Sequence, residues 1–195
     1  MNRPTIVVVD DEPIIRMDIR EILEHEYRVV AEGKNGEEAV ALAHKHKPDL
    51  MIMDVKMPVL NGIKATTIIR KFSDCSVLLL TAYSHKELVQ EARQAGVTAY
   101  LVKPVTEEDL IPAVEIALNQ RDQLTSLKRD IENMKRKIEE RKVIERAKGK
   151  LMDQFSLSEP EAYRWIRQES MNRRISMIQL AEELLFRKEI DVRAD

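Results

Sequence analysis

The sequence predicts an α/β fold, a doubly wound five-stranded parallel sheet, followed by a long coiled-coil helix and a small three-helix domain. Short aliphatic runs alternate with amphipathic helical segments over the first 120 residues, which predicts the sheet. Several of these runs end in polar residues, as strands do at the functional edge of such a sheet. No Pro or Gly occurs between Leu118 and Gly149, which predicts the long helix.

Charge is distributed unevenly along the chain. Of the 195 residues, 44% are hydrophobic and 34% are charged, which suits one large globular domain or two small ones. Residues 1–119 hold 14 Lys and Arg against 19 Asp and Glu, whereas residues 120–195 hold 18 against 15. An acidic front half and a basic back half predict two domains with different partners.

The sequence also predicts a cytoplasmic location. Cys75 is the single cysteine, so no intramolecular disulfide can form, as is usual in a reducing compartment. Acidic residues at positions 10–12 come too early to leave room for the apolar region of a signal peptide. No apolar run approaches the roughly 20 residues that span a bilayer, so we expect no membrane partner.

Five short runs are predicted to be buried strands, because each is aliphatic or β-branched and too short for a helix. They cover residues 5–9, 28–31, 50–53, 76–80 and 99–102. The segments after them carry apolar residues at helical spacing, as at Ile15, Ile19 and Leu23. The predicted helices cover residues 14–25, 36–46, 63–72, 86–94 and 107–118.

Local signals support several ends of these helices. Arg70 and Lys71 suit the last turn of the third helix, and Gly96 suits the end of the fourth. Thr106 is a candidate N-cap for the fifth helix, whereas Pro112 inside it disfavours a regular helix. The third helix has an apolar set that we expect to face the core: Ile63, Ala65, Ile68, Ile69 and Phe72.

Polar residues follow four of the predicted strands, at ends that lie side by side in a doubly wound sheet. In chain order they are Asp10 and Asp11, Asp54, Thr81, and Lys103. Carboxylates brought close together repel each other unless a cation joins them, and hard oxygen ligands of this kind suit Mg²⁺. A lysine, a hydroxyl and a metal around one carboxylate make a site for phosphoryl transfer, with Asp54 as the nucleophile.

Each of these residues also has a simpler explanation when it is taken alone. Asp10 and Asp11 could form a turn, Thr81 could cap a helix, and Lys103 could be a solvated charge. Their order and placement together favour the site. No Gly-rich phosphate loop is present, so the sequence does not predict a nucleotide hydrolase. The histidines lack metal-ligand spacing and are expected at the surface: His25, His44, His46 and His85.

The strand ends carry their residues in a fixed order: Asp10 and Asp11, the loop with Asp54, Met57, Pro58 and Gly62, then Thr81 with Ala82, and Lys103 with Pro104. With this set, residues 3–120 resemble the receiver domain of bacterial two-component response regulators, which has a flavodoxin-like fold. The resemblance implies that Asp54 accepts a phosphoryl group from a phosphohistidine on a sensor histidine kinase.

The resemblance also implies Mg²⁺ as the cofactor. Asp10 or Asp11, Asp54 and the backbone carbonyl of Lys56 would hold the ion. Lys103 would contact the phosphoryl oxygens and precede a cis proline.

Thr81 and Tyr100 match the two switch positions of the family. An aromatic residue in a strand is more often there for packing, so Tyr100 has that alternative.

The segment after residue 120 carries a heptad seam, which predicts a two-helix coiled coil over residues 121–142. The seam consists of Leu124, Leu127, Ile131, Met134 and Ile138. Arg141 and Glu145 interrupt it where it would continue, and the alternative is one amphipathic helix that lies on its own chain. Residues 128–150 contain ten Lys and Arg against five acidic residues. This excess of basic residues indicates either a solvated helix face or a surface that binds phosphates.

The remaining residues predict three helices, over 143–152, 158–171 and 176–188, and the first of them could simply continue the linker helix. Ser158 with Glu161 forms a candidate capping box, and Ser176 is a candidate N-cap. A small core is expected from Ala162, Trp165, Ile166, Ile178, Ala181, Leu184 and Leu185. Tyr163 and Trp165 could stack on nucleobases, but core packing is the simpler role for Trp165.

The tail carries a further set of residues in a fixed order: Ile144 to Met152, Ser158, Glu161, Ala162, Arg167, Met171, and Leu180 to Glu182. With these residues it resembles the ANTAR domain, the RNA-binding module of transcription antitermination regulators. Ser170 and the run Asn172 to Arg174 depart from the family pattern. The resemblance implies binding to RNA stem-loops in nascent mRNA leaders. The candidate contacts are Lys148, Lys150, Arg164, Arg167, Arg173 and Arg174.

The sequence therefore predicts a receiver domain at 1–120, a coiled-coil linker at 121–142 and an ANTAR-type domain at 143–195. The chain would be a phosphoacceptor rather than an enzyme. Phosphorylation of Asp54 would promote a homodimer that binds RNA hairpins and causes antitermination. The alternatives are a DNA-binding response regulator, and a receiver that gates a protein partner through a tail that only dimerises.

Overall fold

The computed structural model describes residues 3–82 and 86–186. The chain divides into two compact units, unit 1 (Met1–Leu127) and unit 2 (Lys128–Asp195), and each is described by itself. The division falls within helix α5, which runs from Glu107 to Phe155. The finer boundaries at residues 120 and 142 stay a prediction. No helix in the described part of the chain is long and apolar enough to cross a membrane.

Unit 1 contains a five-stranded sheet with the strand order β2-β1-β3-β4-β5. All neighbouring strands are parallel, which confirms the predicted doubly wound fold. The strands are β1 (Thr5–Val9), β2 (Arg28–Gly33), β3 (Leu50–Asp54), β4 (Ser76–Thr81) and β5 (Ala99–Val102). The helices between them are α1 (Pro13–Leu23), α2 (Gly36–His46), α3 (Gly62–Ile69) and α4 (Lys86–Gln94).

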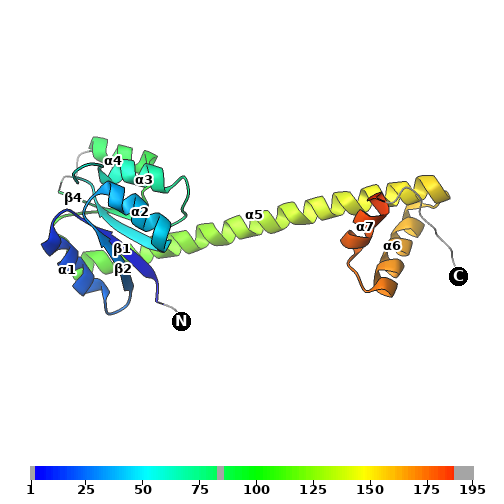
Figure 1. Cartoon of the computed structure of the whole chain (residues 1–195), viewed down its shortest axis with the longest axis horizontal. Coiled ribbons are helices and arrows are strands. Elements are labelled where there is room, and N and C mark those ends of the chain that lie inside the picture. Colours follow the sequence, from blue (N-terminus) through cyan, green and yellow to red (C-terminus); the bar gives the residue numbers. More distant parts are fainter. Residues whose placement is uncertain (1–2, 83–85, 187–195) are drawn as a thin grey trace. The chain divides into compact units, whose positions relative to one another are not determined.

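Helices cover both faces of this sheet, because successive residues of each strand point to opposite sides. Val7, Met51 and Leu79 pack with α2, α3 and α4 in one core. Ile6 and Ile52 pack on the other face with α1 and the first turns of α5. Figure 1 shows α2, α3 and α4 together on one side of the strands. Both cores exclude water from the sheet, so only the strand ends are open to chemistry.

Some predicted boundaries in unit 1 were wrong. The third helix ends at Ile69 rather than Phe72, and Arg70 forms its C-cap. Phe72 therefore lies beyond the helix and is exposed, and Ile68 is exposed on the outer face of α3 instead of facing the core. The predicted helix at 107–118 continues without a break through the linker to Phe155, and it contains Pro112. Proline has no backbone N–H, so Pro112 removes one of the early i→i−4 hydrogen bonds of this helix.

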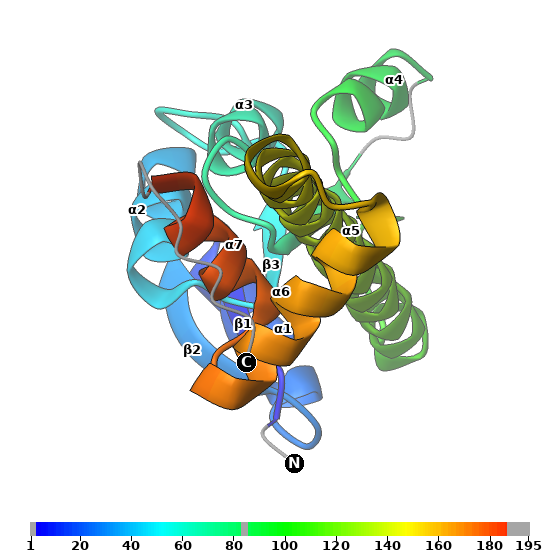
Figure 2. The same cartoon turned by 90° about the vertical axis from the view of Figure 1, so that its right-hand side faces the viewer.

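Unit 2 consists of the end of α5 together with α6 (Glu159–Arg173) and α7 (Met177–Phe186). Figure 2 shows α6 and α7 side by side. The core of the unit is formed by Ala147, Leu151, Ala162, Ile166, Leu180, Ala181 and Leu184. Trp165 is half-buried and packs against this core, which confirms its predicted packing role.

Capping groups start both short helices of unit 2. The carboxylate of Glu161 accepts hydrogen bonds from the backbone N–H and the hydroxyl of Ser158, at 2.8 and 2.6 Å, which confirms the predicted capping box. At α7 the N–H of Gln179 donates to the hydroxyl of Ser176 and its side chain accepts from the Ser176 N–H. The serine was predicted as a cap, but its glutamine partner was not.

Candidate functional site

Three charged side chains meet at the carboxyl edge of the sheet in unit 1. Lys103 Nζ lies 2.6 Å from Asp10 Oδ2 and 2.9 Å from Asp54 Oδ1. Asp10 is fully buried and Asp54 is 5% exposed. β1 ends just before Asp10, β3 ends at Asp54, and Lys103 follows β5, so the parallel pairing of the strands brings the three together. The sequence-based prediction of a cluster at this edge is consistent with this geometry.

The cluster carries two buried carboxylates and one ammonium group. Burial raises the pKa of Asp54 above its ordinary value, the hydrogen bond from Lys103 opposes that rise, and the nearby charge of Asp10 adds to it. Burial disfavours the charge on Lys103, but hydrogen bonds to Asp10 and Asp54 outweigh this effect and raise its pKa. The site therefore has an excess of buried negative charge and an ammonium group that stays protonated.

The loop after β3 holds Asp54 in place through backbone contacts. The N–H of Val55 donates to the Leu80 carbonyl at 2.9 Å, and the N–H of Gly62 donates to the Val55 carbonyl at 3.0 Å. A Cβ atom on Gly62 would lie 2.2 Å from the carbonyl oxygen of Asp54. Because that neighbour is backbone and cannot give way cheaply, the position requires glycine. The backbone N–H of Lys56 also hydrogen-bonds Asp54 and lowers its pKa.

Three further residues were predicted at this site, and they differ in how far they are exposed: Asp11, Thr81 and Tyr100. Asp11 is exposed, next to the buried Asp10. Thr81 is buried at the end of β4, where its carbonyl accepts a hydrogen bond from the Lys103 N–H at 2.8 Å. Tyr100 is 45% exposed on β5. The peptide bond between Lys103 and Pro104 is cis, as predicted.

Arg16 was not singled out from the sequence. Its Nη1 donates to the backbone carbonyl of Asp10 at 2.7 Å, and its Nε lies 3.4 Å from Glu32. The side chain thus fixes the strand end that carries the buried carboxylate. No motif signals this role, because it depends on α1 packing beside β1 and β2.

The donor set of the cluster fits a magnesium ion. Asp10 and Asp54 supply hard carboxylate oxygens beside the backbone of Lys56, and their mutual repulsion favours a cation between them. Within residues 3–82 and 86–186, no three His, Cys, Asp or Glu side chains gather into a metal-binding group. Mg²⁺ needs only one or two protein carboxylates, because it keeps waters and binds phosphate oxygens.

Neutralising Asp54 should stabilise unit 1 at neutral pH without divalent cations. The pKa of Asp54 is higher in the folded than in the unfolded protein, so protonation of Asp54 favours folding. This stabilisation is fully present below the unfolded pKa, at about pH 4, and is lost as the pH rises through the folded-state pKa. Asp54→Asn is neutral throughout. We expect it to raise the free energy of unfolding at pH 7 and to match the wild type near pH 4.

Urea unfolding in the presence of EDTA measures this effect, with hydrogen exchange of the strand amides as the readout for unit 1. Asp11→Asn removes the same charge from an exposed neighbour and should change stability by less than about 0.5 kcal/mol. If Asp54→Asn were no more stable than Asp11→Asn at pH 7, the electrostatic account of the cluster would be wrong.

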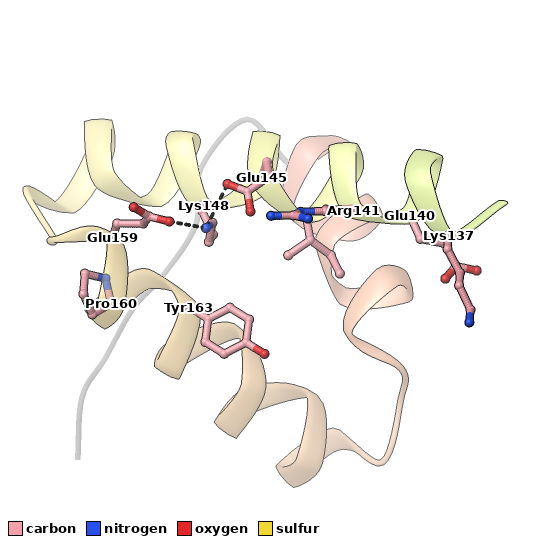
Figure 3. A pocket seen from close by; sticks show the side chains of 9 residues that line it. Lys137, Glu140, Arg141, Glu145, Lys148, Glu159, Pro160 and Tyr163 are labelled. Carbon is pink, nitrogen blue, oxygen red and sulfur yellow. Dashed lines mark hydrogen bonds and ion pairs between the residues drawn. The ribbon is translucent and has the colours of Figure 1, made fainter. Parts of the chain in front are cut away.

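Two lysines that were predicted to contact RNA are engaged inside unit 2. Lys148 is 5% exposed, and its Nζ lies 2.8 Å from Glu145 and 2.7 Å from Glu159. Figure 3 shows it between these two carboxylates. Lys150 Nζ donates to the Leu184 carbonyl in α7 at 2.8 Å. Both lysines thus have structural contacts within unit 2, and contact of either with RNA stays a prediction.

The predicted arginine contacts lie on α6 or at its end. Arg164 and Arg167 are exposed. Arg173 Nη2 pairs with Glu183 at 2.6 Å, and Arg174 is an exposed C-cap with a positive φ of 54°. Contact with RNA stays a prediction for these four.

Gly149 in α5 has no packing reason to be glycine. A Cβ atom there would meet nothing within 4 Å. Gly149→Ala should therefore stabilise unit 2 by about 1 kcal/mol, because alanine loses less backbone entropy in a helix. Thermal unfolding followed by Trp165 fluorescence measures this gain. A destabilised variant would mean that the open space is occupied in the protein in solution.

Comparisons with known proteins cover both units. Residues 6–115 match the response regulator receiver domain family, and residues 132–185 match the ANTAR domain family. The chain is 44% identical over 181 residues to the transcriptional regulatory protein PdtaR of Mycobacterium tuberculosis, covering 92% of this chain and 88% of that one. It is 37% identical over 118 residues to DegU of Brevibacillus brevis, covering 59% and 50% of the two chains.

Solved structures resemble the first part of the chain. The signal receiver domain of NarL from Mycobacterium tuberculosis matches with a TM-score of 0.59 and 28% identity, over 61% of this chain and 98% of that one. A LuxR-family response regulator from Aurantimonas matches with a TM-score of 0.58 and 32% identity, over 62% and 88% of the two chains.

Proposed function

Because this chain belongs to the response regulator family, with a receiver domain followed by an ANTAR domain, we propose that phosphorylation of Asp54 controls the binding of RNA hairpins by unit 2. The observation that carries the proposal is the buried cluster of Asp10, Asp54 and Lys103 in a chain whose residues 132–185 match an RNA-binding family.

Asp54 is the proposed phosphoacceptor. One of its carboxylate oxygens forms a bond to the phosphorus of a phosphohistidine on a sensor histidine kinase, while the bond from phosphorus to the imidazole nitrogen breaks. Lys103 Nζ already lies 2.9 Å from Oδ1, within reach of oxygens on a phosphoryl group attached there. When bound to Asp10, Asp54 and the Lys56 carbonyl, Mg²⁺ would offset negative charge on the transferring group.

Thr81 and Tyr100 would report phosphorylation to the surface of unit 1. The buried Thr81 stands at the end of β4, one strand away from Asp54, where a hydroxyl can move toward a new phosphoryl oxygen. Tyr100 on β5 is half-exposed, so a change in the position of its ring would alter the surface of unit 1. Val102 is also exposed and points to the same side of β5 as Tyr100, so this side presents two large apolar side chains, which supports a docking role that differs between the two states.

Dimerisation through α5 is the proposed output of that change. The five seam residues from Leu124 to Ile138 are each more than half exposed, so no segment of the described chain covers them. This exposure favours a partner helix over the alternative of a helix lying on its own chain. The e position of this heptad repeat, which flanks the seam, is occupied by Lys128, Lys135 and Lys142. In an antiparallel pair of helices the e positions of the two chains face each other, so these like charges would repel. We therefore propose a parallel homodimer.

RNA stem-loops in nascent mRNA leaders are the proposed ligands of the dimer. Protein readout of RNA sequence favours the exposed bases of loops over the deep groove of a duplex. Two copies of unit 2 would hold two loops at once, which raises avidity through effective concentration. Stabilised hairpins would exclude an overlapping terminator and so cause antitermination. In this scheme the chain acts as a phosphoacceptor and not as an enzyme.

Incubation with acetyl phosphate and Mg²⁺ tests the first step. We expect one phosphoryl group on the wild-type chain, located at Asp54 by mass spectrometry, and none on Asp54→Asn. RNA hairpins and duplex DNA should then be compared at one stated salt concentration. Preference for duplex DNA would favour the DNA-binding alternative, and capture of a protein without nucleic acid would favour the gating alternative.

A further inference from the structure

A groove runs along the outer face of α6 in unit 2. It encloses about 690 Å³, which is the size range of small-molecule sites. Its apolar lining comes from Leu157, Trp165 and Met171, and its polar rim includes Arg164 and Arg167. Met171 is 62% exposed, and Trp165 is half-buried, so one side of the indole packs on the core while the rest faces the groove.

The rim of this groove carries a net positive charge. Among the described residues, neither Arg164 nor Arg167 has a carboxylate within 4.0 Å of its guanidinium nitrogens, and the one side-chain hydrogen bond of Arg164 is a long one to the Pro160 carbonyl, at 3.4 Å. The acidic residue of the lining is Glu161, which accepts hydrogen bonds from the N–H and hydroxyl of Ser158 and lies near enough to Arg164 to interact with its charge. The groove therefore combines an apolar floor with two arginines against one glutamate, a net positive charge that favours an anionic ligand.

A second groove, between α5 and α6, has the opposite character. Figure 3 shows Lys137 and Arg141 beside Glu140, with Lys148 held by two further glutamates. Its basic side chains face as many acidic ones, and Lys148 is fixed in ion pairs at 2.7 and 2.8 Å. An anion entering here would meet carboxylates, so this groove is a poor site for RNA even though Tyr163 lies in it.

We propose that the α6 groove binds one unpaired nucleobase of an RNA loop, stacked on Trp165 and Met171, while Arg164 and Arg167 bind the phosphates beside that base. The proposal rests on the proposed function and names the part of unit 2 that reads the loop. Stacking of an unpaired base on an aromatic side chain is how proteins recognise single-stranded RNA, and arginines supply the contacts to phosphate. A duplex cannot use the floor of the groove, because its bases are paired and stacked already.

Trp165 is the single tryptophan of the chain, so its fluorescence reports directly on the groove. The probe is a pool of RNA hairpins that share one stem and carry randomised loops. The matched control RNA has the same stem closed by an abasic linker. We expect the hairpins with bases in the loop to quench Trp165 fluorescence in the full-length phosphorylated protein, and the abasic hairpins to leave it unchanged.

Two variants test the contacts without disturbing the core. Arg167→Ala and Met171→Ala remove exposed side chains, and each should weaken binding of the loop-containing pool by about tenfold. Arg146→Ala removes the same charge from an exposed position of α5 outside the groove and should weaken binding by less than about threefold. The abasic hairpins should not distinguish Met171→Ala from the wild type.

The outcomes separate this inference from the function on which it rests. If the wild type retains hairpins but Trp165 fluorescence does not respond, or if Arg146→Ala costs as much as Arg167→Ala, the groove is not the loop site and the proposed function stands. If the wild type retains no hairpin in either phosphorylation state, the proposed function fails and the groove proposal fails with it.

Discussion

Replacing Lys103 with methionine should lower the free energy of unfolding of unit 1 by about 3 kcal/mol at pH 7. Asp10 and Asp54 are both buried, and Lys103 Nζ is within 2.9 Å of each. Methionine keeps the length of the side chain and removes the charge, so two carboxylates would face each other without a cation. Removing one partner of a buried ion pair costs more than the pair itself contributes, because the remaining charge stays desolvated.

Urea unfolding in EDTA, with hydrogen exchange read in β1 and β3, measures this loss. Lys64→Met provides the matched control, because Lys64 is exposed on α3, and we expect it to change stability by less than about 0.5 kcal/mol. Adding Asp54→Asn to Lys103→Met should restore part of the loss by removing one of the two unpaired charges. Equal stability of Lys103→Met and Lys64→Met would contradict the account of this cluster.

Truncating Leu151 to alanine should destabilise unit 2 by about 3 kcal/mol. The side chain is fully buried at the centre of the small core between α5, α6 and α7. A domain of this size has little stability to lose, so we expect a large part of the population to unfold and RNA binding to fall accordingly. Uptake of phosphate at Asp54 should be unchanged, because unit 1 has its own cores.

Trp165 fluorescence during thermal unfolding follows this change, and mass spectrometry follows phosphorylation in the same samples. Met171→Ala serves as the control within unit 2, since this side chain is 62% exposed and its loss should not shift the transition. Should Leu151→Ala unfold at the same temperature as Met171→Ala, the described core would not be what holds unit 2 together.

Much of unit 1 could be predicted because its strands are unambiguous. Ala99–Val102 and the helix Lys86–Gln94 have the predicted bounds, since each is flanked by clear turn residues. The polar residues at the strand ends could also be placed together, because parallel strands share one edge. Phe72 was misplaced because apolar spacing alone continues past the point where α3 ends at Ile69.

The charges of unit 2 were harder to predict. Lys148 lies in a run of basic residues, which is typical of a solvated surface, yet it is buried. Its partner Glu159 comes eleven residues later, across the turn between α5 and α6, and no local pattern indicates that contact. The groove beside Trp165 was missed for a related reason, because its lining joins Leu157, which precedes α6, to residues along that helix.

The most direct test of the central claim compares retention of RNA hairpins by the full-length chain before and after treatment with acetyl phosphate and Mg²⁺. We expect treatment to raise the affinity of the wild type by roughly tenfold or more, within the usual range of coupling between sites. Asp54→Asn should bind as weakly as the untreated wild type in both conditions. If treatment left the affinity of the wild type unchanged, or raised that of Asp54→Asn equally, control of RNA binding by Asp54 would be contradicted.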